Sequence, residues 1–179
     1  VYTGVQIADP TQSGNTIPFL MGISTGLDAA CVHGVSLGLK RVIGRYAYLV
    51  SFLRIIYRAS PARSRPLVIL RTHNAVYAGT GCIIMNSAYY AGPFRLLRTG
   101  VFDPGLTALI YSFSGIVDWL LFLVVLLFGR LLWHPRIRVV RLDADATLIT
   151  HQPVQCDGDP VFVGKTSRVR CGQAIAVLT

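Results

Sequence analysis

The sequence predicts a mainly β protein with a few helices, an α+β fold whose antiparallel strands form a sandwich-like or barrel-like domain. Of its 179 residues, 53% are hydrophobic and 14% are charged, which supplies enough apolar surface for one domain with a packed core. Beyond Pro66, short β-rich runs alternate with Gly, Asn and Thr. Many short strands with frequent turn residues are typical of antiparallel sandwiches and barrels.

The N-terminal region predicts a β-hairpin followed by a helix. Residues 1–8 and 17–23 are β-like, and the segment 9–15 between them is rich in turn residues. Asp28 precedes residues 29–38 and is suited to capping a helix there. The same carboxylate is also a candidate for shaping a ligand cleft, and the residues alone leave both roles open.

Helical periodicity is clearest at residues 39–57. Apolar side chains recur there at spacings of three and four, which predicts one apolar stripe. The polar positions are basic: Lys40, Arg41, Arg45, Arg54 and Arg58. Such a helix either rests on an anionic membrane or packs its stripe on the sheet, and the sequence does not favour one over the other.

The rest of the chain predicts a series of short strands separated by turns. They are residues 67–71, 75–78, 82–85, 106–111, 136–141, 146–150, 154–156 and 174–178. Residues 86–92 predict a loop. Asn86, at the start of this loop, either makes a polar contact near a cleft or caps a turn.

One apolar run interrupts the strand pattern. Residues 119–128 are ten consecutive apolar residues, bounded by Asp118 and Arg130. A helix that spans a bilayer needs about 20 such residues, so a buried or membrane-touching helix is favoured. Extension of the run to residues 110–133 keeps a small membrane-anchored protein as an alternative.

The chain carries 17 basic and 8 acidic residues, a formal net charge of +9. A basic surface attracts anions such as nucleotide phosphates, an anionic membrane leaflet or nucleic acid. Nucleic acid is the weakest of these partners, because the arginines are scattered and no zinc-finger or RNA-binding aromatic motif accompanies them. A basic domain without a dedicated anionic partner is a further alternative.

The four cysteines and four histidines do not predict a metal site. No two cysteines have Cys-x-x-Cys spacing, and no histidine lies near them in a zinc-ligand pattern. We expect reduced thiols in a cytoplasmic protein, and histidines with structural roles. The chain starts inside a predicted strand, without a Met or a visible signal peptide, so we expect a part of a larger protein.

Two carboxylates near the C-terminus are the main candidates for chemistry. Asp157 and Asp159 are separated by Gly158, and residues two apart point the same way on an extended chain. The glycine permits a tight turn or the close approach of a ligand. Such a pair can share Mg²⁺ binding and proton transfer in phosphoryl transfer. The alternative is a hairpin turn with two solvated aspartates, because Asp-Gly is a frequent hairpin signal.

Four blocks of sequence, taken together, resemble a known family. They are Pro18-Phe-Leu-Met-Gly-Ile-Ser-Thr-Gly-Leu-Asp-Ala29, Cys82-Ile-Ile-Met-Asn-Ser-Ala-Tyr-Tyr-Ala-Gly-Pro-Phe-Arg-Leu96, Val101-Phe-Asp-Pro-Gly-Leu106 and Val154-Gln-Cys-Asp-Gly-Asp-Pro160. In this order they resemble the conserved blocks of the diacylglycerol kinase family, which includes bacterial lipid kinases and the sphingosine and ceramide kinases. The resemblance covers nearly the whole chain.

The resemblance implies a two-domain lipid kinase with a fold shared with NAD kinases. In that fold an N-terminal α/β domain carries a Gly-Gly-Asp-Gly-Thr loop, and a β-sandwich-like C-terminal domain closes over it. Residues 1–179 resemble the C-terminal domain alone, so this fragment is not expected to turn over by itself. ATP and Mg²⁺ are the implied cofactors, and a lipid hydroxyl accepts the γ-phosphate. We therefore expect a cytoplasmic protein that is peripheral at an anionic membrane surface.

Roles for single residues also follow from the resemblance. Asp157 falls on the family's general base, which takes the proton from the lipid hydroxyl. Asp159 falls on a family Glu near ATP and its metal, with Gly158 beside it. In bacterial relatives an Asp directly before the Gly of the Asp-Gly-Leu loop binds Mg²⁺. Here Pro104 stands before Gly105, and the acid lies one place earlier, at Asp103. The leading hypothesis is part of a lipid kinase, and the alternative is a non-catalytic lipid-binding or partner-binding module that retains the fold.

Overall fold

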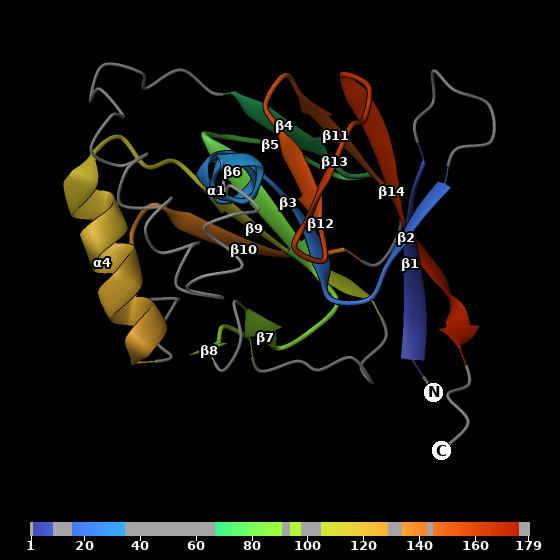
Figure 1. Ribbon diagram of the computed structural model, residues 1–179, viewed down its shortest axis with the longest axis horizontal. Helices are drawn as coiled ribbons and strands as arrows, with labels where there is room; N and C mark the ends of the chain where they lie inside the picture. The colour runs from blue at the N-terminus through green and yellow to red at the C-terminus, as the bar shows by residue number, and fades with distance from the viewer. Residues whose placement is uncertain are drawn as a thin grey trace.

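Two six-stranded antiparallel sheets form the body of the protein (Figure 1). The computed structural model describes residues 2–8, 16–34, 67–90, 94–97, 105–128, 134–142 and 145–175. The first sheet has the order β2 (Thr16–Phe19), β1 (Tyr2–Ala8), β14 (Thr166–Ile175), β11 (Ala146–Thr150), β4 (Val68–Arg71) and β5 (Val76–Gly79). The second has the order β10 (Ile137–Leu142), β9 (Leu106–Tyr111), β6 (Gly81–Met85), β3 (Gly22–Thr25), β12 (Val154–Cys156) and β13 (Asp159–Val161).

The main hydrophobic core lies where side chains of both sheets meet. The first sheet contributes residues such as Leu70 and Leu148, and the second contributes Ile84 and Ile110, all fully buried. Successive side chains of a strand point to opposite faces. In β6 and β9 both faces are buried, because alternate residues enter this core and a second cluster on the other side. These continuous apolar strands therefore lie at the centre of the molecule.

In the described part of the chain, α1 and α4 cover the outer face of the second sheet. α1 (Leu27–Gly34) contacts β3, β12 and β13. α4 (Ile116–Leu127) packs over the outward side chains of β6 and β9, among them Met85 and Leu109. In Figure 1, α4 lies at the left edge of the molecule, whereas β1, β2 and β14 lie at the right. A small third sheet pairs β7 (Tyr89–Tyr90) with β8 (Phe94–Arg95).

The predicted mainly β, sandwich-like fold is confirmed, and so is the N-terminal hairpin of β1 with β2. The single strand predicted at 17–23 is wrong, because the chain turns at Leu20 and Met21 and passes from the first sheet to the second. Gly22 makes this passage possible: a Cβ at this position would lie 2.7 Å from the backbone oxygen of Ile84. Residues 17–23 contain no charged or polar side chain, so the sequence predicts a continuous apolar strand across the turn.

Two further predictions need correction. The last strand begins at Thr166 rather than at residue 174. Its buried residues Ser167 and Val169 alternate with the exposed Arg168 and Arg170. Because several of these residues are polar, the alternation is not visible as a pattern of apolar residues. Asp28 lies inside the first turn of α1 rather than capping it from outside. The helix predicted at 39–57 lies outside the described residues.

The apolar run at 119–128 forms most of α4, as predicted. Ile110 belongs to β9, and this contradicts the longer span considered for residues 110–133. Among the residues that the structure describes, no helix has the length and apolar character needed to cross a membrane.

Candidate functional site

Asp157 holds the turn at which the chain passes between the two sheets. Its Oδ2 accepts a hydrogen bond from the backbone N–H of Leu20 at 2.7 Å. Its Oδ1 accepts from the N–H groups of Met21 at 2.8 Å and Gly22 at 2.9 Å. The backbone N–H of Asp157 in turn donates to the Gly22 carbonyl at 2.9 Å. One residue near the C-terminus therefore fixes the backbone of the β2–β3 turn.

Asn86 holds the same turn from the other side. Its side-chain Nδ2 donates to the Leu20 carbonyl at 3.2 Å, and its backbone N–H donates to the Met21 carbonyl at 3.0 Å. The N–H and C=O groups of Leu20 and Met21 are thus all hydrogen-bonded, although both side chains are exposed. Of the two roles considered for Asn86, the structure gives it the one of a turn-holding residue.

Asp157 and Gly158 form the two-residue loop of the β12–β13 hairpin. Their φ angles are 51° and 90°, and Cys156 pairs with Asp159 across the loop. Two successive positive φ angles define the tight hairpin turn that Asp-Gly favours. The N–H of Gly158 donates to Oε1 of Gln155 at 2.8 Å. The hairpin alternative is therefore correct for the backbone, but the Asp157 carboxylate is bound rather than merely solvated.

The Asp157 carboxylate retains one direction for a further hydrogen bond. Each carboxylate oxygen has two acceptor positions, and Oδ1 uses both of its own on Met21 and Gly22. Oδ2 receives only the Leu20 N–H, and Asp157 is an exposed residue. A proton donor from outside the protein can therefore reach Oδ2. The three hydrogen bonds from the backbone N–H groups of residues 20–22, here called the Asp157 clamp, hold this oxygen in a fixed position.

A second acidic group lies on the outer face of the same sheet. The Asp28 carboxylate on α1 accepts hydrogen bonds from the hydroxyls of Ser24 and Tyr90 and from Nε2 of Gln155, the last at 3.1 Å. Ser24 and Gln155 are directly paired on β3 and β12, and Gln155 Nε2 lies 2.8 Å from Ser24 Oγ. Every side-chain partner of Asp28 in this cluster is a donor, as a carboxylate requires.

Burial and the charge of Asp28 affect the neighbouring acids. Burial, followed by the charge of Asp28 and its hydrogen bond, raises the pKa of Tyr90 well above 10. Burial, and then the charge of Asp28, raises the pKa of the Cys31 thiol to about 12. Both groups stay protonated at neutral pH, so Tyr90 remains a donor to Asp28.

Sequence reasoning missed this second cluster. Only Asp28 was a candidate, whereas Ser24, Tyr90 and Gln155 were not. A signal was present at Gln155: it alternates with the apolar Val154 and Cys156, so it must face the opposite side of the sheet. A buried polar side chain on that face needs partners, and the cross-strand neighbour of Gln155 is Ser24.

The remaining predicted acidic site residues are Asp159 and Asp103. Asp159 is exposed and is the first residue of β13, directly after the hairpin loop, where it pairs with Cys156 of β12. Asp103 lies outside the described residues. Within the described ranges, no three His, Cys, Asp or Glu side chains are close enough together to hold a metal ion. A shallow cavity of about 460 Å³ lies on the first sheet, lined by Arg71, Thr72, His73, Asp145 and Thr147, and contains none of the predicted residues.

The comparisons with known proteins point to one fold. No family model and no curated protein sequence matches the chain. A solved structure described as "a putative diacylglycerol kinase from Bacillus anthracis str. Sterne" matches 94% of this chain and 52% of its own, with 17% identity and a TM-score of 0.64. A structure of a diacylglycerol kinase from the same organism gives 18% identity and a TM-score of 0.60, with coverage of 94% and 53%.

These values establish the fold. The chain is built like the matching half of the solved diacylglycerol kinase structures, and it spans about half of their length. The predicted resemblance is thus confirmed at the level of the fold.

Proposed function

We propose that this chain is the C-terminal half of an ATP-dependent lipid kinase, which transfers the γ-phosphate of ATP to a lipid hydroxyl. One observation supports this most: the fold matches solved diacylglycerol kinases over 94% of the chain while covering only 52–53% of theirs. A partner domain of α/β type with a Gly-Gly-Asp-Gly-Thr loop would complete the nucleotide site. The acceptor lipid is diacylglycerol or a sphingoid-type lipid.

Asp157 is the proposed general base. Its Oδ2 has an acceptor position left, and its Oδ1 is filled by two backbone N–H groups. A lipid hydroxyl that donates to Oδ2 loses its proton there as its oxygen attacks the γ-phosphorus, while the bond from this phosphorus to the β–γ bridging oxygen breaks and ADP leaves. The clamp fixes the carboxylate, and a fixed base needs no reorientation before the reaction.

Asp159 and Gly158 are the proposed contacts to ATP and its metal. Mg²⁺ is usually held by one or two carboxylates together with phosphates and water, rather than by a full protein cage. The exposed carboxylate of Asp159 fits this requirement, with further ligands from the nucleotide and the partner domain. Asp103 is proposed as a ligand of a separate structural Mg²⁺. A Cβ placed on Gly158 meets no atom within 4 Å, so a phosphate has room to approach its backbone.

An anionic membrane surface is the proposed place of action, with the protein peripheral to it on the cytoplasmic side. The formal charge of +9 favours such a surface. Nucleic acid is not proposed as a partner.

Lipid phosphorylation tests the proposal. The protein including the upstream reading frame is incubated with labelled ATP and vesicles that contain diacylglycerol or sphingosine. We expect ATP- and Mg²⁺-dependent phosphorylation of one of these lipids, and none by residues 1–179 alone. If the upstream frame encodes no nucleotide-binding domain, or the complete protein phosphorylates no lipid, the proposal is wrong.

A second function is favoured by one observation. The three N–H donors on Asp157 explain this residue without any chemistry, because they hold a turn. A non-catalytic lipid-binding or partner-binding module would use the clamp only as a structural element. Such a module would bind vesicles or a partner protein but would bind no ATP.

A further inference from the structure

The outward side of α4 is apolar, although surface helices normally carry polar residues there. A helix that is apolar all round is normally buried on every side. The exposed side chains on α4 and at its end are Ile116, Val117, Leu120, Leu121, Val124 and Phe128. They recur at spacings of three and four along the helix and so form one stripe, here called the outer face of α4. In Figure 1, α4 lies at the edge of the molecule, at the opposite end from β1 and β14.

The inward side of α4 already has its partners. Phe122 and Val125 are buried in the cluster beneath the helix. Trp119 packs edge-to-face on Phe113, with 4.6 Å between the ring centroids, and also contacts Tyr111. Rotation of the helix to hide its outer face would expose these large aromatic groups, at a cost of about 1.5–3 kcal/mol for each fully buried side chain. The outer face is therefore a fixed surface.

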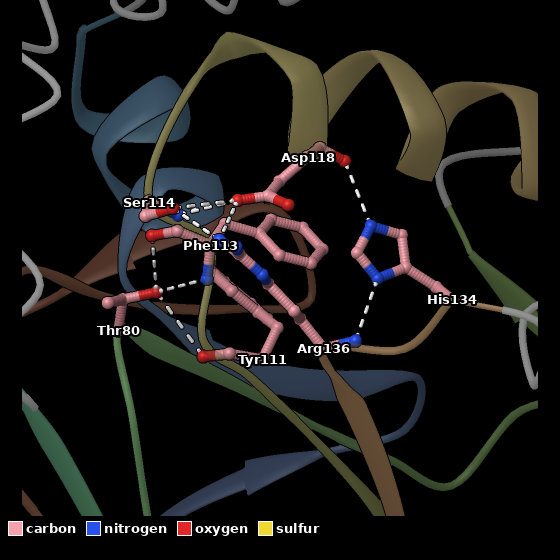
Figure 2. Close-up of polar contacts among 7 residues, drawn as sticks. All are labelled: Thr80, Tyr111, Phe113, Ser114, Asp118, His134 and Arg136. Carbon is pink, nitrogen blue, oxygen red and sulfur yellow. Dashed lines mark hydrogen bonds and ion pairs between the residues drawn. The ribbon is translucent and has the colours of Figure 1, made fainter.

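Polar contacts at the start of α4 fix its orientation further (Figure 2). The Asp118 carboxylate accepts from the Ser114 N–H at 2.7 Å and forms an ion pair with Arg136, also at 2.7 Å. The buried His134 donates from Nε2 to the Asp118 carbonyl at 3.0 Å and accepts at Nδ1 from the Arg136 N–H at 3.2 Å. Asp118 is the one charged residue within the helix, and Arg136 neutralises it.

We propose that the outer face of α4 rests in the headgroup region of an anionic lipid bilayer. The charge of the surrounding chain selects this occupant: residues 94–142 contain six arginines and only two aspartates. Arg141 on β10 is exposed, and it lies on the same face of the second sheet as Ile137, which packs in the cluster beneath α4. Arginines beside an apolar stripe are attracted to anionic headgroups while the stripe enters the acyl boundary. A second copy of the chain would instead bring another charge of +9 to the same place.

The kinds of side chain on the outer face also favour lipid over protein. They are Val, Leu and Ile with one Phe, without Tyr, Trp or Arg. Protein interfaces depend mostly on Trp, Tyr and Arg, and Leu and Val are under-represented among their strongest contacts. Trp119, which could have served as such an anchor, is turned inward. Short aliphatic side chains fit an acyl environment, which demands no shape complementarity.

This inference rests on the proposed membrane contact and names the surface that makes it. Because α4 has 12 residues, it is about 18 Å long, and it is bound to the sheet along one side. It therefore lies flat on the bilayer. Vesicle binding requires no phosphoryl transfer, so its outcome is separate from that of the kinase assay.

Sedimentation with vesicles tests the proposal on the whole chain. We expect binding to vesicles of phosphatidylcholine with about one third phosphatidylglycerol, and at least tenfold weaker binding for the double variant Leu120→Ser with Val124→Ser. These side chains are 55% and 47% exposed. The control is Leu67→Ser with Val76→Ser, the same two residue types at 42% and 61% exposure on the first sheet. This control should bind like the unchanged chain.

A second measurement needs no substitution. Trp119, one of the chain's two tryptophans, lies in α4, so part of the tryptophan fluorescence comes from this helix. Phospholipids with brominated acyl chains should quench this fluorescence when vesicles are added. Equal vesicle binding by both double variants would overturn the proposal. A dimer that Leu120→Ser with Val124→Ser dissociates, with unchanged vesicle binding, would also overturn it and assign the face to a second copy.

Discussion

The side-chain amide of Gln155 donates from Nε2 to the carboxylate of Asp28 at 3.1 Å. Through Oε1 the same amide accepts the N–H of Gly158 at 2.8 Å. One buried side chain thus connects α1 to the hairpin loop that contains Asp157. The two acidic groups of the candidate site are therefore coupled through a single residue.

Replacement of this amide by an apolar group of similar size should destabilise the protein. Gln155→Leu leaves the Gly158 N–H and part of the Asp28 carboxylate without partners, which costs about 1–3 kcal/mol. Urea unfolding followed by circular dichroism measures the loss. Gln152→Leu, in the loop before β12, is the control and should change the free energy of unfolding by less than about 0.5 kcal/mol. Equal effects of the two changes would show that the amide does not couple the two groups.

A methyl group at Gly81 should destabilise the fold by overpacking. A Cβ there would lie 2.1 Å from Cζ and the hydroxyl oxygen of Tyr111, far inside normal contact distance. We expect Gly81→Ala to lower the free energy of unfolding by about 1–3 kcal/mol. Gly115→Ala is the control, since a Cβ there meets no atom within 4 Å. Addition of Tyr111→Leu should relieve the clash, and failure of this double variant to recover any stability would contradict the explanation.

The anchor of α4 should make stability depend on pH at the acidic end. Burial acts to raise the pKa of Asp118, but hydrogen bonds from Ser114 and the charge of Arg136 outweigh it, and the pKa falls below its ordinary value of 3.8. A lowered pKa in the folded state stabilises the protein above pH 3.8, and this contribution is lost as the pH falls through the lowered value. Asp118→Asn lacks this contribution.

Unfolding measured between pH 6 and pH 2.5 checks this prediction. The difference in unfolding free energy between the unchanged chain and Asp118→Asn should be constant above about pH 5 and shrink below pH 3.8. Other carboxylates titrate in both proteins and cancel in the difference. A difference that does not change with pH would show that the ion pair with Arg136 adds nothing to stability.

Three cysteine thiols should be unreactive in the folded protein. Cys31, Cys82 and Cys156 are buried and not in disulfides, and burial is the largest cause that raises the pKa of each to about 12. The thiolate, which is the reactive form, is therefore scarce at pH 8. Ellman's reagent should label these three only after the addition of denaturant, as mass spectrometry of the labelled peptides can establish. Labelling of any of them at the rate of a free thiol in the folded chain would contradict the burial.

Local signals made much of this fold predictable. Asp157 and Gly158 adopt positive φ angles at low cost, so their sequence predicts the hairpin loop that the structure contains. The apolar runs of β6 and β9 predict strands, and their burial on both faces explains why they lack polar alternation.

The contacts of the candidate site were not predictable in the same way. Asp157 reaches Leu20 across 137 positions in the sequence, and this contact exists only because β12 pairs with β3. The Asp28 cluster likewise joins residues from α1, β3, β7 and β12. Long-range pairings of this kind are set by the packing of the whole fold, and no short window of sequence contains them.

The proposed base is tested most directly by removal of its negative charge in the complete kinase. Asp157→Asn keeps the size and the tolerance of positive φ, but the amide cannot take the proton from a lipid hydroxyl. We predict at least a hundredfold lower kcat for lipid phosphorylation, with ATP binding retained and with the chain still folded by circular dichroism. Asp145→Asn, directly before β11 of the first sheet, is the control and should leave kcat unchanged. Undiminished turnover by Asp157→Asn would contradict the account and leave Asp157 as the clamp of the β2–β3 turn alone.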